Sequence, residues 1–365
     1  MINVSQPYIP NKLNFDKRVR SIFDSKILTN SGKLLKELES HLESYLGVDN
    51  VICVSNGTIA LQVAYKALNL QGEVITTPFS YIATTSSLLW EGLNPVFCDI
   101  CPDTLNINTS LLAKYINKNT SALVPVHVFG NPCEVEAISS ISKNNDLKVI
   151  YDAAHAFNIM YESNNQQINI LNFGDISTLS FHATKIFHTI EGGAVITNDD
   201  NLASKIRAMI NFGIDASNNI SIIGTNAKMS EFQAAMGLCV LEEYDAINYS
   251  REKIWNRYKN ALSNDFEFPK WNNKATNNYS YVPIIFDSEE SLLRSLFKLN
   301  EDNIYPRRYF YPSLNTTQYF KPQSYQLTCP ISEDISKRIL CLPIYPGLKD
   351  ETVDFISDSL LKSHK

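Results

Sequence analysis

The chain has 365 residues, 44% of them hydrophobic, which is enough apolar material for a large core. Its formal net charge is -6 and its pI is near 5.6, so the protein offers no overall positive field to nucleic acid or to an acidic membrane. The first 20 residues lack a signal-peptide pattern, and no apolar run approaches the ~18 residues of a membrane span. We therefore expect a cytoplasmic globular protein that has neither nucleic acid nor a membrane as its partner.

Seven short runs rich in β-branched residues are expected to be strands. They are 51–55, 73–77, 94–98, 121–126, 147–151, 177–181 and 193–197. These runs are apolar on both faces and several are separated by stretches with helical spacing, which is typical of a mostly parallel sheet covered by helices on both sides. The clearest helix follows the first run, where apolar residues form one stripe from Ala60 to Leu68. The sequence thus predicts an α/β fold with a seven-stranded sheet.

A second long helical pattern begins at residue 228, with Ser230 as a candidate N-cap, and continues into a charged stretch. We place a domain boundary near residue 245, inside or beside this helix. The large domain would span residues 1–245, including the N-terminal segment. Residues 246–365 mix strand-like and helical patterns and are expected to form a smaller α+β domain.

The cysteines do not indicate a metal site. Seven is an odd number, and in a reducing compartment free thiols are the default state. Cys98 and Cys101 form a C-x-x-C pair, but no second cysteine or histidine pair lies at the spacing of a zinc site. We expect no metal.

The turn after the first predicted strand is a candidate phosphate site. In the stretch SNGTIAL, Gly57 and Thr58 open a helix, and the N–H groups at a helix start attract anions. The simpler interpretation is a capped helix start without a ligand. The chain has neither G-x-G-x-x-G nor the P-loop pattern, which argues against a dinucleotide or nucleoside triphosphate site.

Three more side chains lie beside predicted strands. Asp152 follows the apolar run 147–151 and needs a cationic or N–H partner, although it is equally well read as an N-cap. Lys185 lies between two predicted buried strands; it is either a solvated loop residue or an amine with a lowered pKa that can form a Schiff base. Tyr81 follows the second predicted strand. Its ring either stacks on a ligand or packs in the core.

Together these features match one cofactor. A phosphate seat, an aspartate that pairs with a protonated ring nitrogen and an amine that binds an aldehyde correspond to the three groups of pyridoxal 5'-phosphate. Each feature is weak alone, and their combination is what favours this cofactor.

Six stretches, in order along nearly the whole chain, resemble the successive motifs of the DegT/DnrJ/EryC1/StrS sugar aminotransferases. They are TPFSYIAT, PVHVFGNPCEVEAI, YDAAHAF, SFHATKIFHTIEGGAVIT, GTNAKMSEFQAAMGL and LPIYPGL. The resemblance implies the type I fold of pyridoxal phosphate enzymes. It also implies a transaminase, because Lys185 stands where a dehydratase branch of the family has histidine.

The resemblance assigns roles around the cofactor. It implies that Lys185 forms the Schiff base, that Asp152 pairs with the pyridine nitrogen and that Tyr81 stacks on the ring. His155 stands where many relatives have glutamine; either side chain can reach the phenolic oxygen, and the tautomer of His155 stays open.

The resemblance further implies how the phosphate is held. Gly57, Thr58 and Ser180 would bind it within one chain, while Asn226 would reach the phosphate of the neighbouring chain. The family forms dimers in which the partner completes each site, so a homodimer with shared active sites is expected.

The substrates implied by the resemblance are L-glutamate and a nucleotide-linked keto sugar. Residues 26–48 and 305–315 look most like the enzymes that convert dTDP-4-dehydro-6-deoxy-D-glucose to dTDP-4-amino-4,6-dideoxy-D-glucose, for O-antigen or another surface polysaccharide. Guanidinium groups suit the diphosphate, although an exposed basic turn explains at least one of the two arginines in 305–315 equally well. The candidate substrate residues are Asn30, Lys33, Arg307, Arg308, Tyr309 and Tyr311.

Other interpretations stay open at this point. The acceptor could carry a 3-keto group or a UDP moiety, and nothing in composition or spacing distinguishes these. A protein of this fold could also bind the cofactor as a regulator without turnover. A nucleotide-sugar oxidoreductase is disfavoured, because no glycine pattern for NAD is present.

Overall fold

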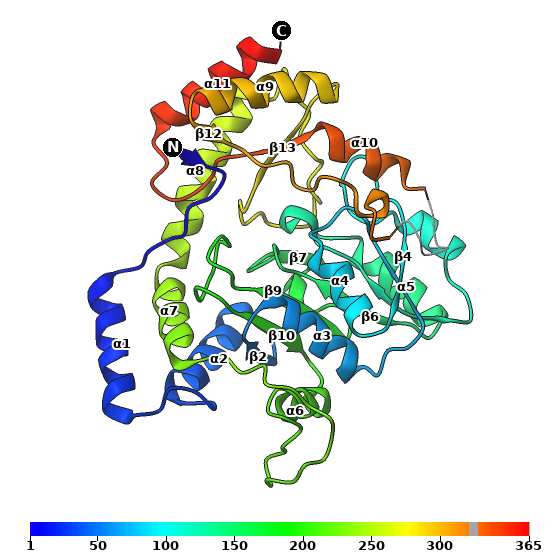
Figure 1. The fold of residues 1–365 in the computed structure, drawn as a ribbon, viewed down its shortest axis with the longest axis vertical. Coiled ribbons are helices and arrows are strands. Elements are labelled where there is room, and N and C mark those ends of the chain that lie inside the picture. Colours follow the sequence, from blue (N-terminus) through cyan, green and yellow to red (C-terminus); the bar gives the residue numbers. More distant parts are fainter. Residues whose placement is uncertain (321–327, 365) are drawn as a thin grey trace.

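A computed structural model describes residues 1–320 and 328–364 (Figure 1). At its centre lies a seven-stranded sheet with the strand order β2-β10-β9-β6-β5-β3-β4. Only β10 runs antiparallel to its neighbours, while the other pairings are parallel. The strands are β2 (Asn50–Val54), β3 (Glu73–Thr76), β4 (Asn94–Phe97), β5 (Thr120–Val124), β6 (Lys148–Asp152), β9 (Ile176–Ser180) and β10 (Gly193–Thr197). The predicted α/β class and the seven predicted strands are confirmed.

The sheet separates two apolar layers. Along β2, Val51 and Cys53 belong to one core cluster and Ile52 and Val54 to the other, as expected for side chains that alternate across a strand. The first cluster includes side chains of α2 (Lys33–Leu46), α5 (Val135–Asn144) and α7 (Glu231–Glu242); the second includes those of α3 (Gly57–Ala67), α4 (Ala83–Trp90) and α6 (Asp200–Met209). Burial on both faces explains why the strands read as continuous apolar runs.

The helices α7 and α8 (Tyr244–Leu262) link this sheet to the C-terminal elements. Ser230 is the N-cap of α7 and forms a reciprocal capping box with Gln233, as the sequence predicts for the cap. In α8, Tyr244 packs in the core of the sheet, whereas Ile254 belongs to the core of the C-terminal elements. The helix therefore serves both cores, and the boundary near residue 245 stays a prediction.

The C-terminal elements surround a short antiparallel pair, β11 (Val282–Ile285) and β13 (Ile339–Leu342). Against it pack α9 (Glu289–Glu301), α10 (Pro330–Arg338) and α11 (Asp350–His364). The first residues of the chain join this region, since β1 (Ile2–Asn3) pairs in parallel with β12 (Ile304–Tyr305) before α1 (Lys12–Ser25) begins (Figure 1).

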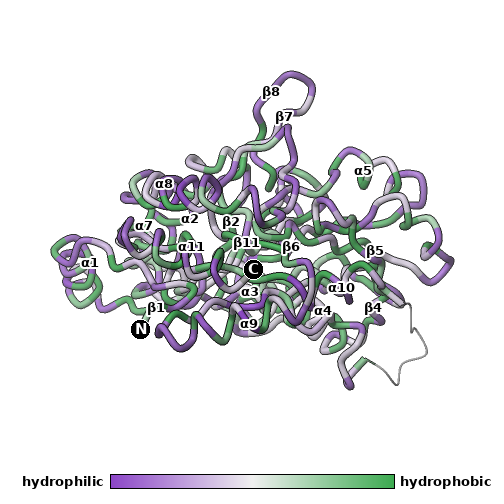
Figure 2. The backbone as a smooth tube through the Cα atoms, turned by 90° about the horizontal axis from the view of Figure 1, so that it is seen from above, coloured by the Kyte–Doolittle hydropathy of each residue, from purple (hydrophilic) through white to green (hydrophobic). Residues whose placement is uncertain are grey.

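Smaller elements complete the fold. The hairpin of β7 (Met160–Ser163) and β8 (Gln166–Asn169) projects from the body (Figure 2). Short 3-10 turns cover Thr109–Lys114, Val128–Gly130, Ile170–Asn172 and Leu314–Thr316. Among the described residues, no helix is both long and apolar enough to cross a membrane. The same residues contain no cluster of histidine, cysteine, aspartate or glutamate suited to a metal ion.

Candidate functional site

A cavity of about 320 Å³ lies at the carboxyl ends of the parallel strands. This is where open α/β sheets bind their ligands, and the volume lies in the usual range for a small-molecule site. Eight of the residues selected from the sequence line it: Gly57, Thr58, Tyr81, Asp152, His155, Ser180, Lys185 and Tyr309. Strands far apart in the sequence thus deliver most of the predicted cofactor residues to one place.

The helix start at Gly57 is shaped to hold an anion. The Asn56 side chain caps α3 by accepting a hydrogen bond from the Ile59 amide at 2.9 Å, and the first N–H groups of a helix have no partner within it. A Cβ atom on Gly57 would lie only 2.8 Å from the Cβ of Ser180, so only glycine lets the end of β9 approach this closely. The amides of α3 and the Ser180 hydroxyl therefore form a cradle that fits a phosphate.

Asp152 is the last residue of β6 and is buried. Its carboxylate accepts a hydrogen bond from the Thr84 hydroxyl at 2.7 Å and one from the Ala154 amide at 3.2 Å. Burial raises the pKa of Asp152, while the bond from Thr84, the bond from Ala154 and the charge of Lys185 act in the opposite direction. Within the described part of the chain no cation lies at ion-pair distance from Asp152, which leaves it able to pair with a cationic ligand group.

Lys185 follows β9 and is half-buried. Its Nζ atom donates to the Tyr281 hydroxyl at 3.3 Å. Burial lowers the pKa of Lys185 to about 8, although the negative charge of Asp152 acts to raise it. A substantial fraction of the amine is therefore neutral near pH 8, as a nucleophile that forms a Schiff base must be.

The tautomer of His155 follows from its backbone neighbour. The amide of Phe129 donates to Nδ1 of His155 at 3.2 Å, so Nδ1 carries no proton. Burial and the charge of Lys185 both lower the pKa of His155 well below its usual value, so the ring is neutral. The proton of the neutral ring then lies on Nε2, which makes His155 a hydrogen-bond donor there, as a phenolic oxygen requires.

Two tyrosines of the cavity wall come from different regions. Tyr81, on the turn after β3, is 62% exposed, so a ring face is free to stack on a ligand. Tyr309 belongs to the C-terminal elements, and its ring meets that of Tyr281 edge-on at 5.8 Å between centroids. The cavity wall thus combines a residue that follows a strand of the central sheet with one from the C-terminal elements.

Except for Tyr309, the candidates for binding the sugar nucleotide lie outside this cavity. Arg307 is exposed, and Arg308 forms an ion pair with Glu289 at 2.7 Å while its guanidinium lies 3.5 Å from the ring centre of Tyr311. Neither arginine lines the cavity within the described residues. Their roles in binding, and that of Tyr311, stay predictions.

The N-terminal candidates and Asn226 are also outside the cavity of a single chain. Asn30 and Lys33 are exposed, at the start of α2, and Asn226 is exposed and accepts from Lys228 Nζ at 2.8 Å. An exposed position is compatible with a residue that serves a second chain. The role of Asn226 at the phosphate of a second chain stays a prediction.

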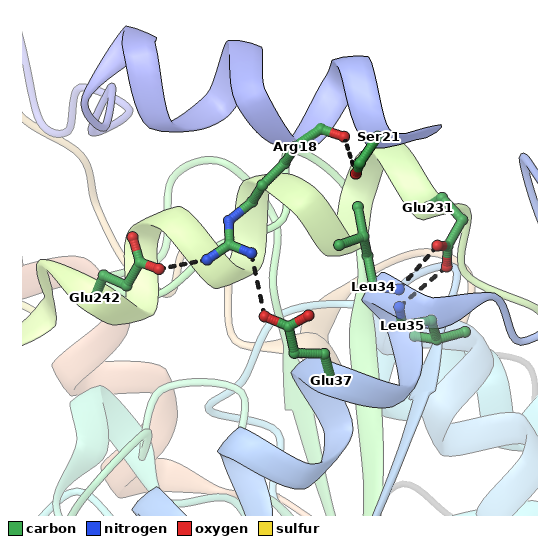
Figure 3. A network of polar contacts seen from close by, with 7 residues as sticks. All are labelled: Arg18, Ser21, Leu34, Leu35, Glu37, Glu231 and Glu242. Atoms are coloured by element: carbon green, nitrogen blue, oxygen red, sulfur yellow. Dashed lines mark hydrogen bonds and ion pairs between the residues drawn. The ribbon is translucent and has the colours of Figure 1, made fainter. Parts of the chain in front are cut away.

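A polar network fixes the segment that carries Asn30 and Lys33 (Figure 3). The buried Glu231 carboxylate accepts from the amides of Leu34 and Leu35 at 2.9 and 3.0 Å, which caps α2. Arg18 of α1 reaches both Glu37 of α2 and Glu242 of α7. Three helices are thereby joined beside this segment.

Sequence reasoning missed three groups of the site. Thr84 lies inside the quoted stretch TPFSYIAT but received no role, and Phe129 acts only through its backbone amide. Tyr281 had no motif around it; the one available signal was its place within the strand-like stretch YSYVPIIF, residues 279–286.

Known proteins resemble this chain over nearly its whole length. The DegT/DnrJ/EryC1/StrS aminotransferase family matches residues 11–361. A dTDP-4-amino-4,6-dideoxy-D-glucose transaminase of Shigella dysenteriae is 40% identical over 98% of both chains, and one of Escherichia coli is 37% identical over 99% of this chain and 98% of its own. The crystal structure of DesI in the presence of its TDP-sugar product covers 100% of this chain and 93% of its own, with 31% identity and a TM-score of 0.92.

The match spans both the sheet and the C-terminal elements, and it includes each cavity residue predicted from the sequence. The chain therefore belongs to the DegT/DnrJ/EryC1/StrS aminotransferase family, whose cofactor is pyridoxal 5'-phosphate.

Proposed function

We propose that this enzyme transfers the amino group of L-glutamate to dTDP-4-dehydro-6-deoxy-D-glucose and forms dTDP-4-amino-4,6-dideoxy-D-glucose. The observation that carries the reaction type is the placement of the Lys185 amine and the Asp152 carboxylate in one cavity, next to a cradle that fits a phosphate. The acceptor is proposed from the two relatives named for this product, at 40% and 37% identity over nearly the whole chain.

Pyridoxal 5'-phosphate supplies an aldehyde that binds amines and a ring that accepts electrons from the carbon next to the amine. The cavity residues fit these groups. The amides of α3 and the Ser180 hydroxyl would hold the phosphate, Lys185 would take the aldehyde, and Nε2 of His155 would donate to the phenolic oxygen. Tyr81 offers an exposed ring face for stacking.

Lys185 and Asp152 have different proposed roles in the reaction. The Lys185 amine, whose pKa is about 8, would remove the proton from Cα of glutamate in the first half of the reaction and would return a proton to the sugar carbon in the second half. Asp152 would keep the ring nitrogen of the bound cofactor protonated, and its carboxylate is oriented by Thr84 and the Ala154 amide. This arrangement stabilises negative charge only as it develops, which lowers the barrier rather than strengthening ground-state binding.

The acceptor carries a diphosphate, which an acidic protein must neutralise locally. Arg307 is exposed and its side chain has no ion pair within the described residues, so it is the stronger of the two arginine candidates. We propose that Asn30, Lys33 and Tyr309 also contact the sugar nucleotide.

We propose a homodimer in which each chain lends residues to the other site. The segment after α6 extends from the body (Figure 1) and carries Phe212, Ile220 and Ile223, which are 53%, 81% and 94% exposed. Apolar side chains this exposed, close to Asn226 in the sequence, suit contact with a second copy. Sedimentation velocity should give a dimer, and Ile223→Glu should weaken both the dimer and cofactor binding. A monomer with full cofactor affinity would refute the shared site.

The proposed reaction is tested with a panel of keto nucleotide sugars. The purified enzyme with pyridoxal 5'-phosphate and glutamate should aminate the dTDP-linked 4-keto sugar, and NMR should place the new nitrogen on C4. Faster turnover of a 3-keto or UDP-linked sugar would change the acceptor but keep the enzyme class. Failure of glutamate alone to change the cofactor absorbance would favour a regulator without turnover.

Three other assignments are also proposals. We propose a cytoplasmic location, which cell fractionation tests, and a product used for a surface polysaccharide. We also propose that the chain divides near residue 245, in the first turn of α8. Limited proteolysis that cuts there first would support the division.

A further inference from the structure

A short segment of the C-terminal elements reaches the wall of the cavity. Asn278, which is fully buried, donates through Nδ2 to the carbonyl oxygens of His155 and Phe157, both at 2.9 Å. Its Oδ1 atom accepts from the Ser280 hydroxyl at 2.7 Å. Asn278 therefore ties the residues before β11 to the segment that carries His155.

Arg251 of α8 binds the backbone of the residues just before β11. Its guanidinium is buried and donates through Nη1 to the carbonyl oxygens of Tyr279 and Ser280 at 3.4 and 3.2 Å. Within the described residues no carboxylate lies at ion-pair distance from it, which is unusual because a buried charge without an opposite charge is costly. Burial raises the pKa of Tyr281, and the charge of Arg251 acts in the opposite direction.

Asn278 and Arg251 fix the backbone beside Tyr281, and the contacts of Tyr281 fix its side chain. Its hydroxyl accepts from Nζ of Lys185 at 3.3 Å, and its ring lies 4.6 Å from the ring of His155 and 5.8 Å from that of Tyr309. Rings on two sides restrict the rotation of the tyrosine. The hydroxyl is thus a fixed partner for the amine.

We propose that Tyr281 is a positioning residue for Lys185: its hydroxyl holds the amine in the cavity, and the Asn278–Arg251 anchors set the place of that hydroxyl. This inference rests on the proposed function of Lys185. It also means that the C-terminal elements, and not the sheet alone, complete the reactive centre.

The proposal predicts a change in how Lys185 titrates. An ammonium group can only donate hydrogen bonds, so the Tyr281 oxygen favours the charged form of the amine. Asp152 and Tyr81 also favour the charged form of Lys185. His155, in the same cavity, is neutral. Removing the hydroxyl while these remain should lower the pKa of Lys185 further below about 8.

The test uses the cofactor-free enzyme. Pyridoxal 5'-phosphate is added at a series of pH values, the product is trapped with borohydride, and labelling of residue 185 is quantified by mass spectrometry. In wild type the labelling rate should rise with pH through about 8, because only the neutral amine reacts. In Tyr281→Phe the midpoint should lie about one pH unit lower, since a hydrogen bond to a charged group is lost.

Turnover should change in the opposite sense. At pH 7 Tyr281→Phe should label faster than wild type, but its kcat should be on the order of tenfold lower, with KM for glutamate unchanged, because the amine is held less well. General unfolding would lower both rates. Tyr279→Phe is the matched control: it removes a hydroxyl from the same segment, where the bond goes to Glu252 at 2.8 Å, and should match wild type in both assays.

The outcomes separate the two proposals. If wild-type Lys185 is not labelled at any pH, the proposed function fails. If it is labelled but Tyr281→Phe has the wild-type midpoint, the role of Tyr281 is refuted while the proposed function stands.

Discussion

Asp152 and Lys185 lie in one cavity and each has fixed partners, whereas Arg307, Arg308, Asn30 and Lys33 lie outside it. Asp152 is the last residue of β6, and Lys185 lies in the turn that follows β9, the parallel neighbour of β6, so adjacent strands bring the two residues together. The other four lie on loops or at a helix start. One chain therefore brings Asp152 and Lys185 into the same cavity by itself, whereas its fold does not bring the other four residues there.

The same difference appears in the electrostatics. Burial raises the pKa of Asp152 and lowers that of Lys185, so both groups are tuned by the fold. The guanidinium of Arg308 forms an ion pair with Glu289 and donates a hydrogen bond to the carbonyl oxygen of Lys337 at 2.9 Å. A basic residue that lies close to site residues in the sequence therefore need not offer an unpaired positive charge to a ligand.

The largest effect should come from the cofactor end. Lys185→Ala should abolish covalent attachment of pyridoxal 5'-phosphate, seen as loss of its absorbance shift, and slow amino transfer by about a thousandfold or more, because no other amine replaces the base. Lys66→Ala is the control: this exposed lysine pairs with Glu91 at 3.1 Å on the outside of α3 and should leave both readings unchanged. A Lys185→Ala enzyme with full activity would refute the proposed reaction.

Asp152→Asn should have the next largest effect. The amide keeps the shape of the carboxylate but not its charge, so the cofactor should still bind while amino transfer slows by roughly a hundredfold, on the scale of a lost charge contact in the transition state. Stopped-flow absorbance with glutamate alone would measure this half-reaction. An unchanged rate would remove Asp152 from the mechanism.

Thr84→Val sharpens that result. It keeps the carboxylate and removes only its 2.7 Å hydrogen bond, so the pKa of Asp152 should rise further and the same half-reaction should slow by about tenfold. The half-reaction should also become more sensitive to low pH, because more of Asp152 is then protonated. An effect larger than that of Asp152→Asn would mean that Thr84 acts on the substrate directly.

The smallest effects should come from the arginines, in different assays. Arg307→Ala should raise KM for the nucleotide sugar by about tenfold, without change in KM for glutamate or in Tm, because an exposed contact to phosphate is lost. Arg308→Ala should instead lower the stability by about 1 to 3 kcal/mol, seen as a Tm lower by a few degrees, because its hydrogen bonds and ion pair are lost. The reverse pattern would make Arg308 the binding residue.

Much of this was readable from the chain alone. The seven strands are apolar on both faces, and that pattern identifies a covered parallel sheet without any coordinates. The cavity residues Gly57, Asp152 and Lys185 could be selected because each lies close to such a strand. Local chemistry and order along the chain carry this information.

The tertiary structure decided what no local pattern records. The bond between Lys185 and Tyr281 joins residues 96 positions apart, and the tautomer of His155 depends on the Phe129 amide, 26 positions away. It also separated Arg308, which is paired, from Arg307, which is exposed. The physical reason is that pKa values, tautomers and free charges depend on which groups surround a side chain in space, and only the folded chain sets those surroundings.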